Sequence, residues 1–457
     1  MIKKRIFAMI MAVIILMGIA CKKEKSETDP AVNVVLLFTA MAPPCDNSGD
    51  LYHAITLDYG TSGRTHYQMG EYFGLQTIGL NDDFERIFDW YIYMASAIVP
   101  YGTMIQRALA IKPQIPAAYQ EEINGLASVC TGTEDKLLDG KLSLNEVYLL
   151  QTLPDVWISA SCSSVAVFGT TSATGKTIIG RNLEWFGGIP FNYLSKLQAV
   201  VTVKNTSGND VCLIGYLGFL GCITGFNDQG LFGAIQVSNG DTSLYDAAGK
   251  GSYNMNLRYV LETQDSVADA GAFLTGTGAG TDPYQYAAGH LLVFADPIEA
   301  RVFEYDPAPH RGMRNWESTM KTGIDWVTHD YTIGAVNSFV LDGIDSFDNH
   351  TGNNVLRWNT MRTQLQSKLD DTATPGTVTV PEVKEVITYH VGSKPGADKN
   401  DLYRGHIQQT IIYQPATPNS AEVHFHPLCV QSPGSYKDDG TTMELFLRLL
   451  LLIFKGC

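Results

Sequence analysis

The spacing of hydrophobic positions divides the chain near residue 162. Upstream, three stretches read as buried or amphipathic helices: residues 82–99, 101–111 and 116–129. A fourth stretch, residues 143–153, opens with Ser143 and has Glu146 three places later, which is the spacing of a helix-capping box. We therefore expect residues 31–161 to be mostly helical.

Downstream of residue 162 the pattern changes to strands. Short hydrophobic runs are separated by Gly, Asn and Asp, which is typical of β-strands joined by turns. These runs are residues 163–169, 176–185, 196–204, 210–226, 231–238, 290–307, 410–415 and 420–427. Helical spacing returns over residues 254–274, 353–369 and 381–391. Strands in runs with helices between them predict layered α+β packing.

The first 20 residues have the pattern of an export signal. MIKKR is a positively charged start, and the apolar stretch that follows is shorter than the about 20 residues that span a bilayer. The ending GIAC resembles a bacterial lipoprotein signal in which Cys21 is lipidated, although Gly18 stands where such signals usually have leucine. Residues 22–30 form a polar tether. We expect residues 1–20 to be removed and the chain to be exported and anchored by lipid to the bacterial cell envelope; ordinary secretion is the alternative.

The C-terminal residues 444–457 are also very apolar. Arg448 interrupts this stretch, which is too short to span a bilayer. We expect a buried terminal strand or helix, and contact with a membrane surface is the alternative.

Composition and charge narrow the class of protein. The 457 residues are 45% hydrophobic and 17% charged, which suits one large globular domain or two of ordinary size. The net charge of −15 argues against a nucleic-acid partner, which needs clustered Lys and Arg. The absence of a C-x-x-C pair disfavours a structural zinc site. Besides Cys21 and Cys162 the chain has six cysteines, whose pairing the sequence does not give: Cys45, Cys130, Cys212, Cys222, Cys429 and Cys457.

Cys162 opens the most informative segment, CSSVAVFGTTSATGKTIIGRNLEW, residues 162–185. A cysteine begins an alternating strand, a Gly-rich turn follows, and a second strand carries Arg181 and Glu184. Taken alone, Cys162 reads as a small buried hydrophobe, as free cysteines usually are. The whole segment resembles the N-terminal-nucleophile amide hydrolases, which include choloylglycine hydrolases, penicillin V acylases, acid ceramidase and self-cleaving acyltransferases. Weaker similarities extend over residues 115–430.

This resemblance implies a fold and a reaction. The fold would be a four-layer αββα sandwich over residues 162–457, with residues 31–161 as a propeptide or small subunit. Cleavage between Ser161 and Cys162 would give Cys162 a free α-amine, so that nucleophile and base belong to one residue. No cofactor or metal is needed for this chemistry.

The resemblance also implies roles for individual residues. Arg181 would orient Cys162 and favour its thiolate; the alternative is a structural arginine paired with a carboxylate. Glu184 would hold the α-amine and is one methylene longer than the aspartate of the family. Asn337 would donate to the oxyanion; the alternative is a turn residue before a strand. Arg357 would lie near the nucleophile; the alternative is a solvated helix arginine.

Other motifs carry less chemistry. A second oxyanion donor could be Gln236 or Asn239, whose register the sequence does not give. The loop GTTSATGKT differs from a phosphate-binding loop because five residues, not four, separate its glycines and a strand follows it. His424 and His426 share a strand face but lack a third metal ligand in register.

We therefore expect an exported, self-cleaving hydrolase of N-acyl amides, made of a small and a large subunit from one precursor. A cluster of aromatic residues upstream indicates an apolar acyl pocket or a lipid-facing surface, with ordinary helix core as the alternative: Phe84, Phe88, Trp90, Tyr91 and Tyr93. The alternative activities are those of an acyltransferase or of a bile-salt or penicillin acylase. The alternative from another class is a non-catalytic surface lipoprotein that binds ligands.

Overall fold

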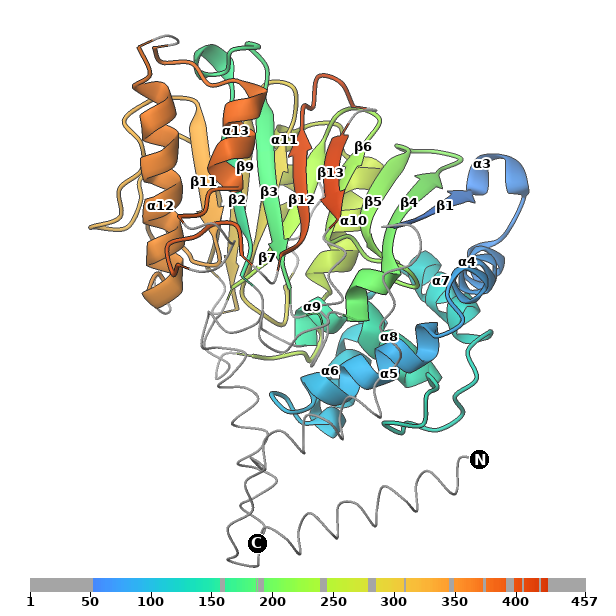
Figure 1. The fold of residues 1–457 in the computed structure, drawn as a ribbon. Coiled ribbons are helices and arrows are strands. Elements are labelled where there is room, and N and C mark those ends of the chain that lie inside the picture. The colour runs from blue at the N-terminus through green and yellow to red at the C-terminus, as the bar shows by residue number, and fades with distance from the viewer. Residues whose placement is uncertain are drawn as a thin grey trace, which may run out of the picture. The chain divides into compact units, whose positions relative to one another are not determined.

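Two β-sheets pack face to face, and helices cover their outer faces (Figure 1). The computed structural model describes residues 52–156, 161–185, 187, 193–238, 245–277, 285–307, 310–344, 349–372, 375–391, 398–404, 407–418 and 421–425. All of them belong to one compact unit, Cys45–Gln431. The expected signal, Cys21, the polar tether and the apolar C-terminal stretch lie outside the described residues.

Within the described residues, the larger sheet has eight strands and the smaller has five. The larger sheet runs β1 (His53–Asp58), β4 (Gln198–Lys204), β5 (Val211–Tyr216), β6 (Thr224–Asn227), β7 (Phe232–Val237), β8 (His290–Ala295), β9 (Ala300–Asp306), β10 (His310–Arg314). The smaller sheet runs β11 (Thr332–Val336), β2 (Ser163–Val167), β3 (Ile178–Glu184), β12 (Ile407–Tyr413), β13 (Ala421–Phe425). β1 and β4 are parallel, and the other neighbours are antiparallel.

The alternation of side chains along each strand builds the layers. In β2, Ala166 joins the core between the sheets, whereas Val165 and Val167 face the other way. The core between the sheets also contains residues from both sides, such as Phe232 and Ile411.

Helices cover both outer faces. α12 (Gly352–Leu369) and α13 (Val380–Ile387) pack on the smaller sheet through residues such as Trp358 and Val383. α10 (Tyr253–Thr263) and α11 (Val267–Thr275) pack against strands of the larger sheet. The layers are therefore helix, sheet, sheet, helix, and the expected αββα fold class is confirmed.

The single helix expected over residues 254–274 is wrong, because the structure has two. The side chains of Asn209 and Asn227 both donate to the carbonyls of Leu261 and Gln264, which satisfies the end of α10 without a further turn. Ser266 then caps α11 by accepting from the amide of Asp269 at 3.1 Å.

The segment before Cys162 is mostly helical, as expected. Its elements are α3 (Tyr59–Ser62), α4 (His66–Leu80), α5 (Phe84–Ala95), α6 (Tyr101–Ile111), the 3₁₀ turn Lys112–Gln114, α7 (Ala117–Ala127), α8 (Leu144–Gln151) and α9 (Leu153–Val156). The capping box of α8 is present, since Ser143 and Glu146 each accept from the backbone amide of the other. None of the helices in the described part of the chain has the length and apolar character to cross a membrane.

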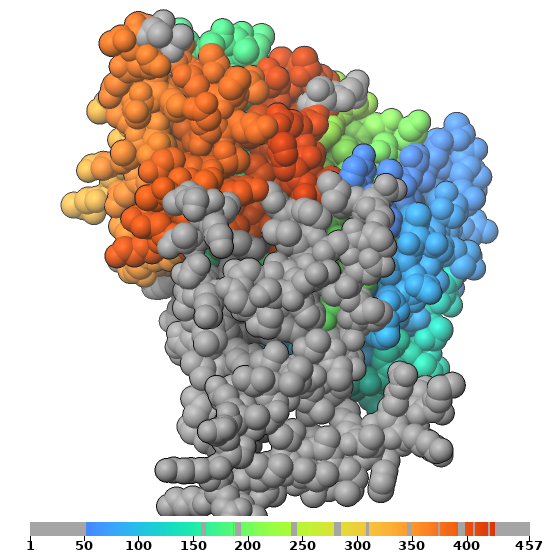
Figure 2. Space-filling model, in the orientation of Figure 1, coloured from blue at the N-terminus to red at the C-terminus, as the bar shows by residue number. Residues whose placement is uncertain are grey.

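β1 extends this segment into the sandwich. It pairs with β4 from His53 opposite Ala199 to Asp58 opposite Lys204, at the edge of the larger sheet. In the space-filling view the segment, blue to cyan, lies on the opposite side of the visible face from α12 and α13, in orange (Figure 2). The larger sheet is thus built from residues that precede Cys162 and residues that follow it.

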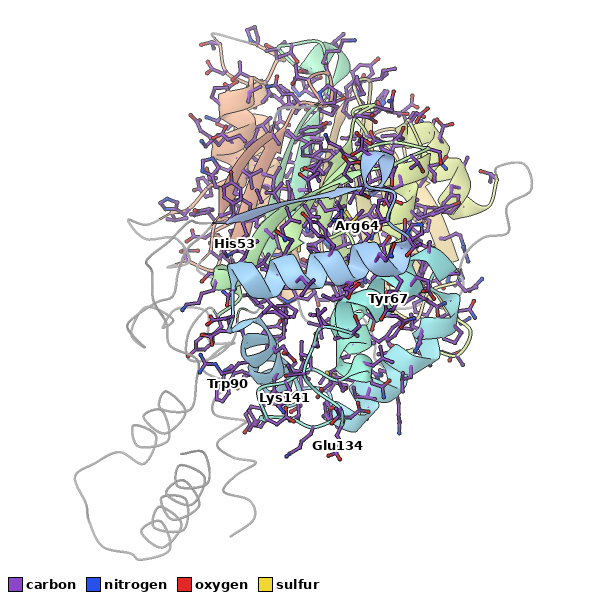
Figure 3. All side chains as sticks on the ribbon, turned by 90° about the vertical axis from the view of Figure 1, so that its right-hand side faces the viewer. His53, Arg64, Tyr67, Trp90, Glu134 and Lys141 are labelled. Carbon is purple, nitrogen blue, oxygen red and sulfur yellow. The ribbon has the colours of Figure 1, made fainter. Side chains whose placement is uncertain are left out.

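Glycines allow a close approach of α4 and α7. A Cβ atom on Gly70 would run into the backbone of Glu122, and one on Gly125 would run into the backbone carbonyl of Tyr67. Figure 3 shows α4 as the long helix in front, with Tyr67 near one end. The two helix backbones therefore touch where these glycines lie.

We expect Gly70→Ala to lower the free energy of unfolding by at least about 2 kcal/mol, because the new methyl group meets backbone atoms that cannot turn away. Gly79→Ala on the same helix is the matched control. Its methyl group would enter open space, so the gain in helix propensity should stabilise the protein by about 0.5–1 kcal/mol. Urea unfolding of the two variants measures the difference, and equal midpoints would contradict this packing.

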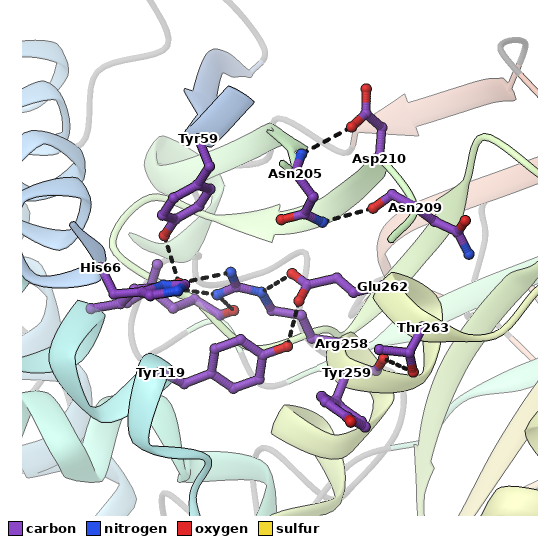
Figure 4. Close-up of polar contacts among 12 residues, drawn as sticks. Tyr59, His66, Tyr119, Asn205, Asn209, Asp210, Arg258, Tyr259, Glu262 and Thr263 are labelled. Atoms are coloured by element: carbon purple, nitrogen blue, oxygen red, sulfur yellow. Dashed lines mark hydrogen bonds and ion pairs between the residues drawn. The ribbon is translucent and has the colours of Figure 1, made fainter. Parts of the chain in front are cut away.

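A buried ion-pair network joins the helical segment to the sandwich. Arg258 on α10 donates to both oxygens of Glu122 on α7, at 2.5 and 3.1 Å, and to Glu262 at 2.8 Å. Tyr59 donates to Glu122, and the ring of Tyr119 lies 4.3 Å from the Arg258 guanidinium. Figure 4 shows Arg258 reaching between these groups. Burial alone would raise the pKa of Glu122, but Arg258 and the other hydrogen-bond donors hold it below its usual value.

Candidate active site

Three neighbouring strands bring the predicted site residues together. Cys162 immediately precedes β2, whose first residue, Ser163, pairs with Asn182 on β3 and with Val336 on β11. Asn337 follows β11 directly. The side chain of Cys162 is buried, with only 1% of the residue exposed.

Arg181 lies against the Cys162 thiol. Its Nη2 is 3.9 Å from Cys162 Sγ and donates to the carbonyl of Ile235 at 2.8 Å, while Nη1 donates to the hydroxyl of Thr224. None of the carboxylates in the described part of the chain forms an ion pair with Arg181. The alternative of an arginine paired with a carboxylate is therefore not what the structure shows.

The pKa of the Cys162 thiol is raised in this structure. Burial is the largest cause, and the positive charges of Arg181 and Arg357 oppose it without outweighing it. The structure is that of the full-length chain, in which the nitrogen of Cys162 is a peptide nitrogen. Arg181 thus acts in the expected direction, but the expected low thiol pKa is absent here because the thiol is fully desolvated.

Arg357 connects the backbone of Cys162 to the side chain of Asn337. Its Nη1 donates to the backbone carbonyl of Cys162, and its Nη2 donates to Asn337 Oδ1 at 2.9 Å. Burial lowers the pKa of Arg357 to about 10, so the guanidinium stays protonated at neutral pH. Arg357 is a buried residue of the site, and the alternative of a solvated helix arginine is wrong.

The side-chain amide of Asn337 is linked to the backbone of Cys162 through Arg357. It is fully buried, and its Nδ2 donates to the carbonyl of Val237 at 2.5 Å. A side-chain amide nitrogen has two hydrogens, so a second one is available for an oxyanion.

Glu184 lies on the opposite face of β3 from Arg181, because the two residues are three positions apart along the strand. Its backbone carbonyl accepts from the amide of Ser161 at 3.2 Å and lies 4.0 Å from Cys162 Sγ. Its negative charge acts on both Cys162 and Arg357, and it raises the pKa of each. The carboxylate therefore belongs to the same charged cluster.

Sequence reasoning missed two residues of this cluster, Asn349 and Asn354. Asn354 donates to the backbone carbonyl of Asn337 at 2.9 Å and accepts from Arg357 at 2.7 Å. Asn349 donates to the same Asn337 carbonyl at 3.3 Å. The only signal in the sequence was the density of asparagines just before Arg357.

The remaining candidates fall in several places. Gln236 is buried and donates to Ser164 at 2.8 Å, and Asn239 and His426 lie outside the described residues. His424 is partly exposed and contacts Glu422. No group of three or more His, Cys, Asp or Glu among the described residues could hold a metal ion. The Gly-rich turn is followed by β3 and, with Trp316 and Tyr331, lines a cavity of about 730 Å³ at the other end of β2.

A small apolar cavity lies between the helical segment and the sandwich, and Tyr216 on its wall interacts electrostatically with Arg181. Its volume is about 20 Å³, close to the space that one water needs, about 10–15 Å³. It is lined by Phe88, Tyr91, Leu150, Leu153, Pro154, Trp185, Leu194, Tyr216, Phe219 and Ile223. Phe88 and Tyr91, two residues of the aromatic cluster expected from the sequence, are therefore buried and also line this cavity.

Asp155 is a buried carboxylate seven residues before Cys162. It accepts from the hydroxyl of Ser252, the backbone amide of Tyr253 and the side chain of Asn254, which ties α9 to the start of α10. Burial outweighs these hydrogen bonds and raises the pKa of Asp155 to about 7.

This raised pKa predicts a pH dependence of stability. Because folded Asp155 binds its proton more tightly than the unfolded chain does, this group stabilises the fold at low pH. That stability falls as pH rises from about 4 to about 7. Asp155→Asn should flatten the dependence, and Asp342→Asn, at an exposed position, should not. Urea midpoints from pH 4.5 to 7.5 measure it, and an unchanged slope in Asp155→Asn would rule it out.

The chain is similar to known proteins in structure but matches none of them in sequence. No protein-family model matches the chain, and no curated protein sequence matches it. A Caenorhabditis elegans ortholog of N-acylethanolamine-hydrolyzing acid amidase matches with 12% identity and a TM-score of 0.37, over 57% of this chain and 95% of that one. A conjugated bile acid hydrolase from Clostridium perfringens matches with 14% identity and a TM-score of 0.34, over 58% and 92%. Penicillin V acylase from Agrobacterium tumefaciens matches with 13% identity and a TM-score of 0.33, over 56% and 80%.

Proposed function

We propose that this protein is a self-cleaving N-terminal-nucleophile hydrolase that uses Cys162 to cleave the C–N bond of linear N-acyl amides. The observation that carries the proposal is the buried cluster around Cys162. Arg181 lies 3.9 Å from the thiol, and Arg357 links the Cys162 carbonyl to the Asn337 amide. A structural cysteine needs none of these partners.

Self-cleavage would begin with the thiol of Cys162 attacking the carbonyl carbon of Ser161. A C–S bond forms, the C–N bond of the Ser161–Cys162 peptide breaks, and the nitrogen takes the thiol proton as it becomes an amine. Water then hydrolyses the thioester, which leaves a carboxylate on Ser161 and a free thiol and α-amine on Cys162. The hydrogen bond from the Ser161 amide to the Glu184 carbonyl supports a fixed position for this peptide.

Turnover would then use the new α-amine as the base. Its ordinary pKa, about 7.7–8.0, leaves part of it unprotonated near neutral pH, so it can take the thiol proton. The thiolate attacks the acyl carbonyl, and the second hydrogen of Asn337 Nδ2 stabilises the oxyanion, an interaction worth about 3–4 kcal/mol. The protonated amine gives its proton to the leaving nitrogen, and water releases the acyl group from the thioester.

The apolar cavity supports a substrate with an apolar acyl group. Its wall comes from residues on both sides of Cys162, such as Tyr91 upstream and Tyr216 downstream. At about 20 Å³ it is too small for an acyl chain. Side chains or the upstream helices would have to move before such a substrate could bind.

Export and lipid anchoring belong to the same proposal. They rest on the charged start, the apolar stretch and Cys21 in the sequence GIAC. An enzyme held at the bacterial cell envelope in this way would meet its substrates outside the cytoplasm.

The proposal is tested on the purified full-length protein in acidic and in neutral buffer. Intact mass and N-terminal sequencing should show a new chain that starts at Cys162. The products should then be measured with fatty acyl ethanolamides, glycine-conjugated bile acids and penicillin V, with and without an added acyl acceptor. An unbroken chain that hydrolyses none of them, yet binds one, would favour the non-catalytic lipoprotein.

A further inference from the structure

Three asparagines are linked by hydrogen bonds beside Arg357, and two of them, Asn337 and Asn354, contact its guanidinium. Asn337, Asn349 and Asn354 come from the end of β11, from the chain before α12 and from the first turn of α12. All three are buried, with at most 6% of any of them exposed.

Hydrogen bonds connect the three asparagines and Arg357 to one another and to the nearby backbone. Arg357 Nη2 donates both to Asn337 Oδ1, at 2.9 Å, and to Asn354 Oδ1, at 2.7 Å. Asn354 Nδ2 donates to the backbone carbonyls of Asn337 and Asn349, both at 2.9 Å. Asn349 Oδ1 accepts from the backbone amide of Phe339 at 2.8 Å. The backbone on both sides of residue 338 is therefore held by side chains.

These bonds fix which way the Asn337 amide points. Oxygen and nitrogen of a side-chain amide are nearly equal in size, so hydrogen bonds decide the orientation. Arg357 can only donate, so Asn337 Oδ1 must face it and Nδ2 must face the carbonyl of Val237. Asn354 in turn fixes the guanidinium, because its Oδ1 accepts from the same Nη2.

We propose that Asn354 is a positioning residue for the reaction at Cys162, which it aligns through Arg357 and through the backbone of Asn337. If the Asn354 side chain is removed, Arg357 loses an acceptor. The Asn337 carbonyl then also loses the shorter of its two side-chain hydrogen bonds. A shift of the oxyanion donor by about 1 Å is enough to slow a reaction about a hundredfold. The inference rests on the proposed function.

The test compares Asn354→Ala with Asn359→Ala, an exposed asparagine on the same helix. We expect Asn354→Ala to lower kcat by about 10–100-fold with KM changed less than about twofold, since an interaction made in the transition state is lost. Asn359→Ala should match the wild type. A loss of kcat that only follows the folded fraction, a change confined to KM, or no change would overturn the inference.

A second variant distinguishes the hydrogen bond between Asn354 and Arg357 from the one between Asn354 and the Asn337 carbonyl. Asn354→Asp keeps an acceptor for Arg357 but has no hydrogen to give to Asn337. It should recover part of the rate lost in Asn354→Ala if alignment runs through Arg357. Rates equal to or below those of Asn354→Ala would leave only the bond to the Asn337 carbonyl, which overturns the route through Arg357.

The inference and the proposed function can fail separately. Alkylation of Cys162 by iodoacetamide, followed by peptide mass across pH, needs no turnover. Because Arg357 lowers the pKa of the Cys162 thiol, a displaced Arg357 should move the alkylation profile to higher pH. If the wild type cleaves no amide but Asn354→Ala still shifts the profile, the proposed function fails and the positioning role stands. An unshifted profile in a folded variant overturns the positioning role.

Discussion

Cys162→Ala should abolish self-cleavage and lower the rate of amide hydrolysis at least about 10,000-fold, because the variant has no nucleophile. The fold should survive, since the change removes one buried sulfur atom and about 1 kcal/mol of stability is typical of a point substitution. Intact mass follows the first reaction, and product formation from an N-acyl amide follows the second.

Cys222→Ala is the matched control for this result. Cys222 is also fully buried; burial raises the pKa of its thiol, and the positive charge of the same Arg181 opposes this rise without outweighing it. The Cys222→Ala protein should therefore cleave itself and hydrolyse substrate at the same rate as the wild type. A Cys162→Ala protein that still acquires a new N-terminus at residue 162, or still hydrolyses amides, would place the chemistry at another residue.

Arg258→Met should lower the free energy of unfolding by about 3–5 kcal/mol, because it leaves Glu122 and Glu262 without their buried cation. Adding Glu122→Gln to this variant should recover part of the loss, since the uncompensated charge is then removed. Urea unfolding at pH 7 provides the measurement.

A surface pair supplies the comparison for Arg258. Arg301 pairs with Glu299 at 2.7 Å, and both side chains are partly exposed, so Arg301→Met should lower stability by less than about 1 kcal/mol. If the two variants unfold at the same urea concentration, the buried network does not hold the helical segment to the sandwich.

The sequence predicted those parts of the fold that depend on local pattern. The strand pair around Cys162, helices α5 to α8 and the capping box at Ser143 follow from spacing along the chain, whereas α4 was not predicted. β1 was not predicted, because its pairing with β4 joins residues about 145 positions apart. The break between α10 and α11 was missed for a similar reason, since Asn209 and Asn227 reach it from other elements.

The candidate site also has a part that local sequence pattern predicted and a part that it did not. Cys162, Arg181 and Glu184 belong to one recognisable segment, whereas Asn337 and Arg357 rested on short and weaker motifs. The structure places all five around one buried point. No local pattern could show that burial outweighs the arginines at the thiol, or that Asn349 and Asn354 hold Asn337.

The pairing of β1 with β4 has a consequence for recovery from denaturation. If the Ser161–Cys162 bond is cut as we propose, the edge strand β1 and the rest of the sheet would belong to separate polypeptides. Renaturation of the cleaved protein would be a second-order process that slows on dilution, whereas the uncut chain would renature at a rate independent of concentration. The mature protein would thus be assembled once, as a single chain, and afterwards persist through slow unfolding and not through easy reassembly.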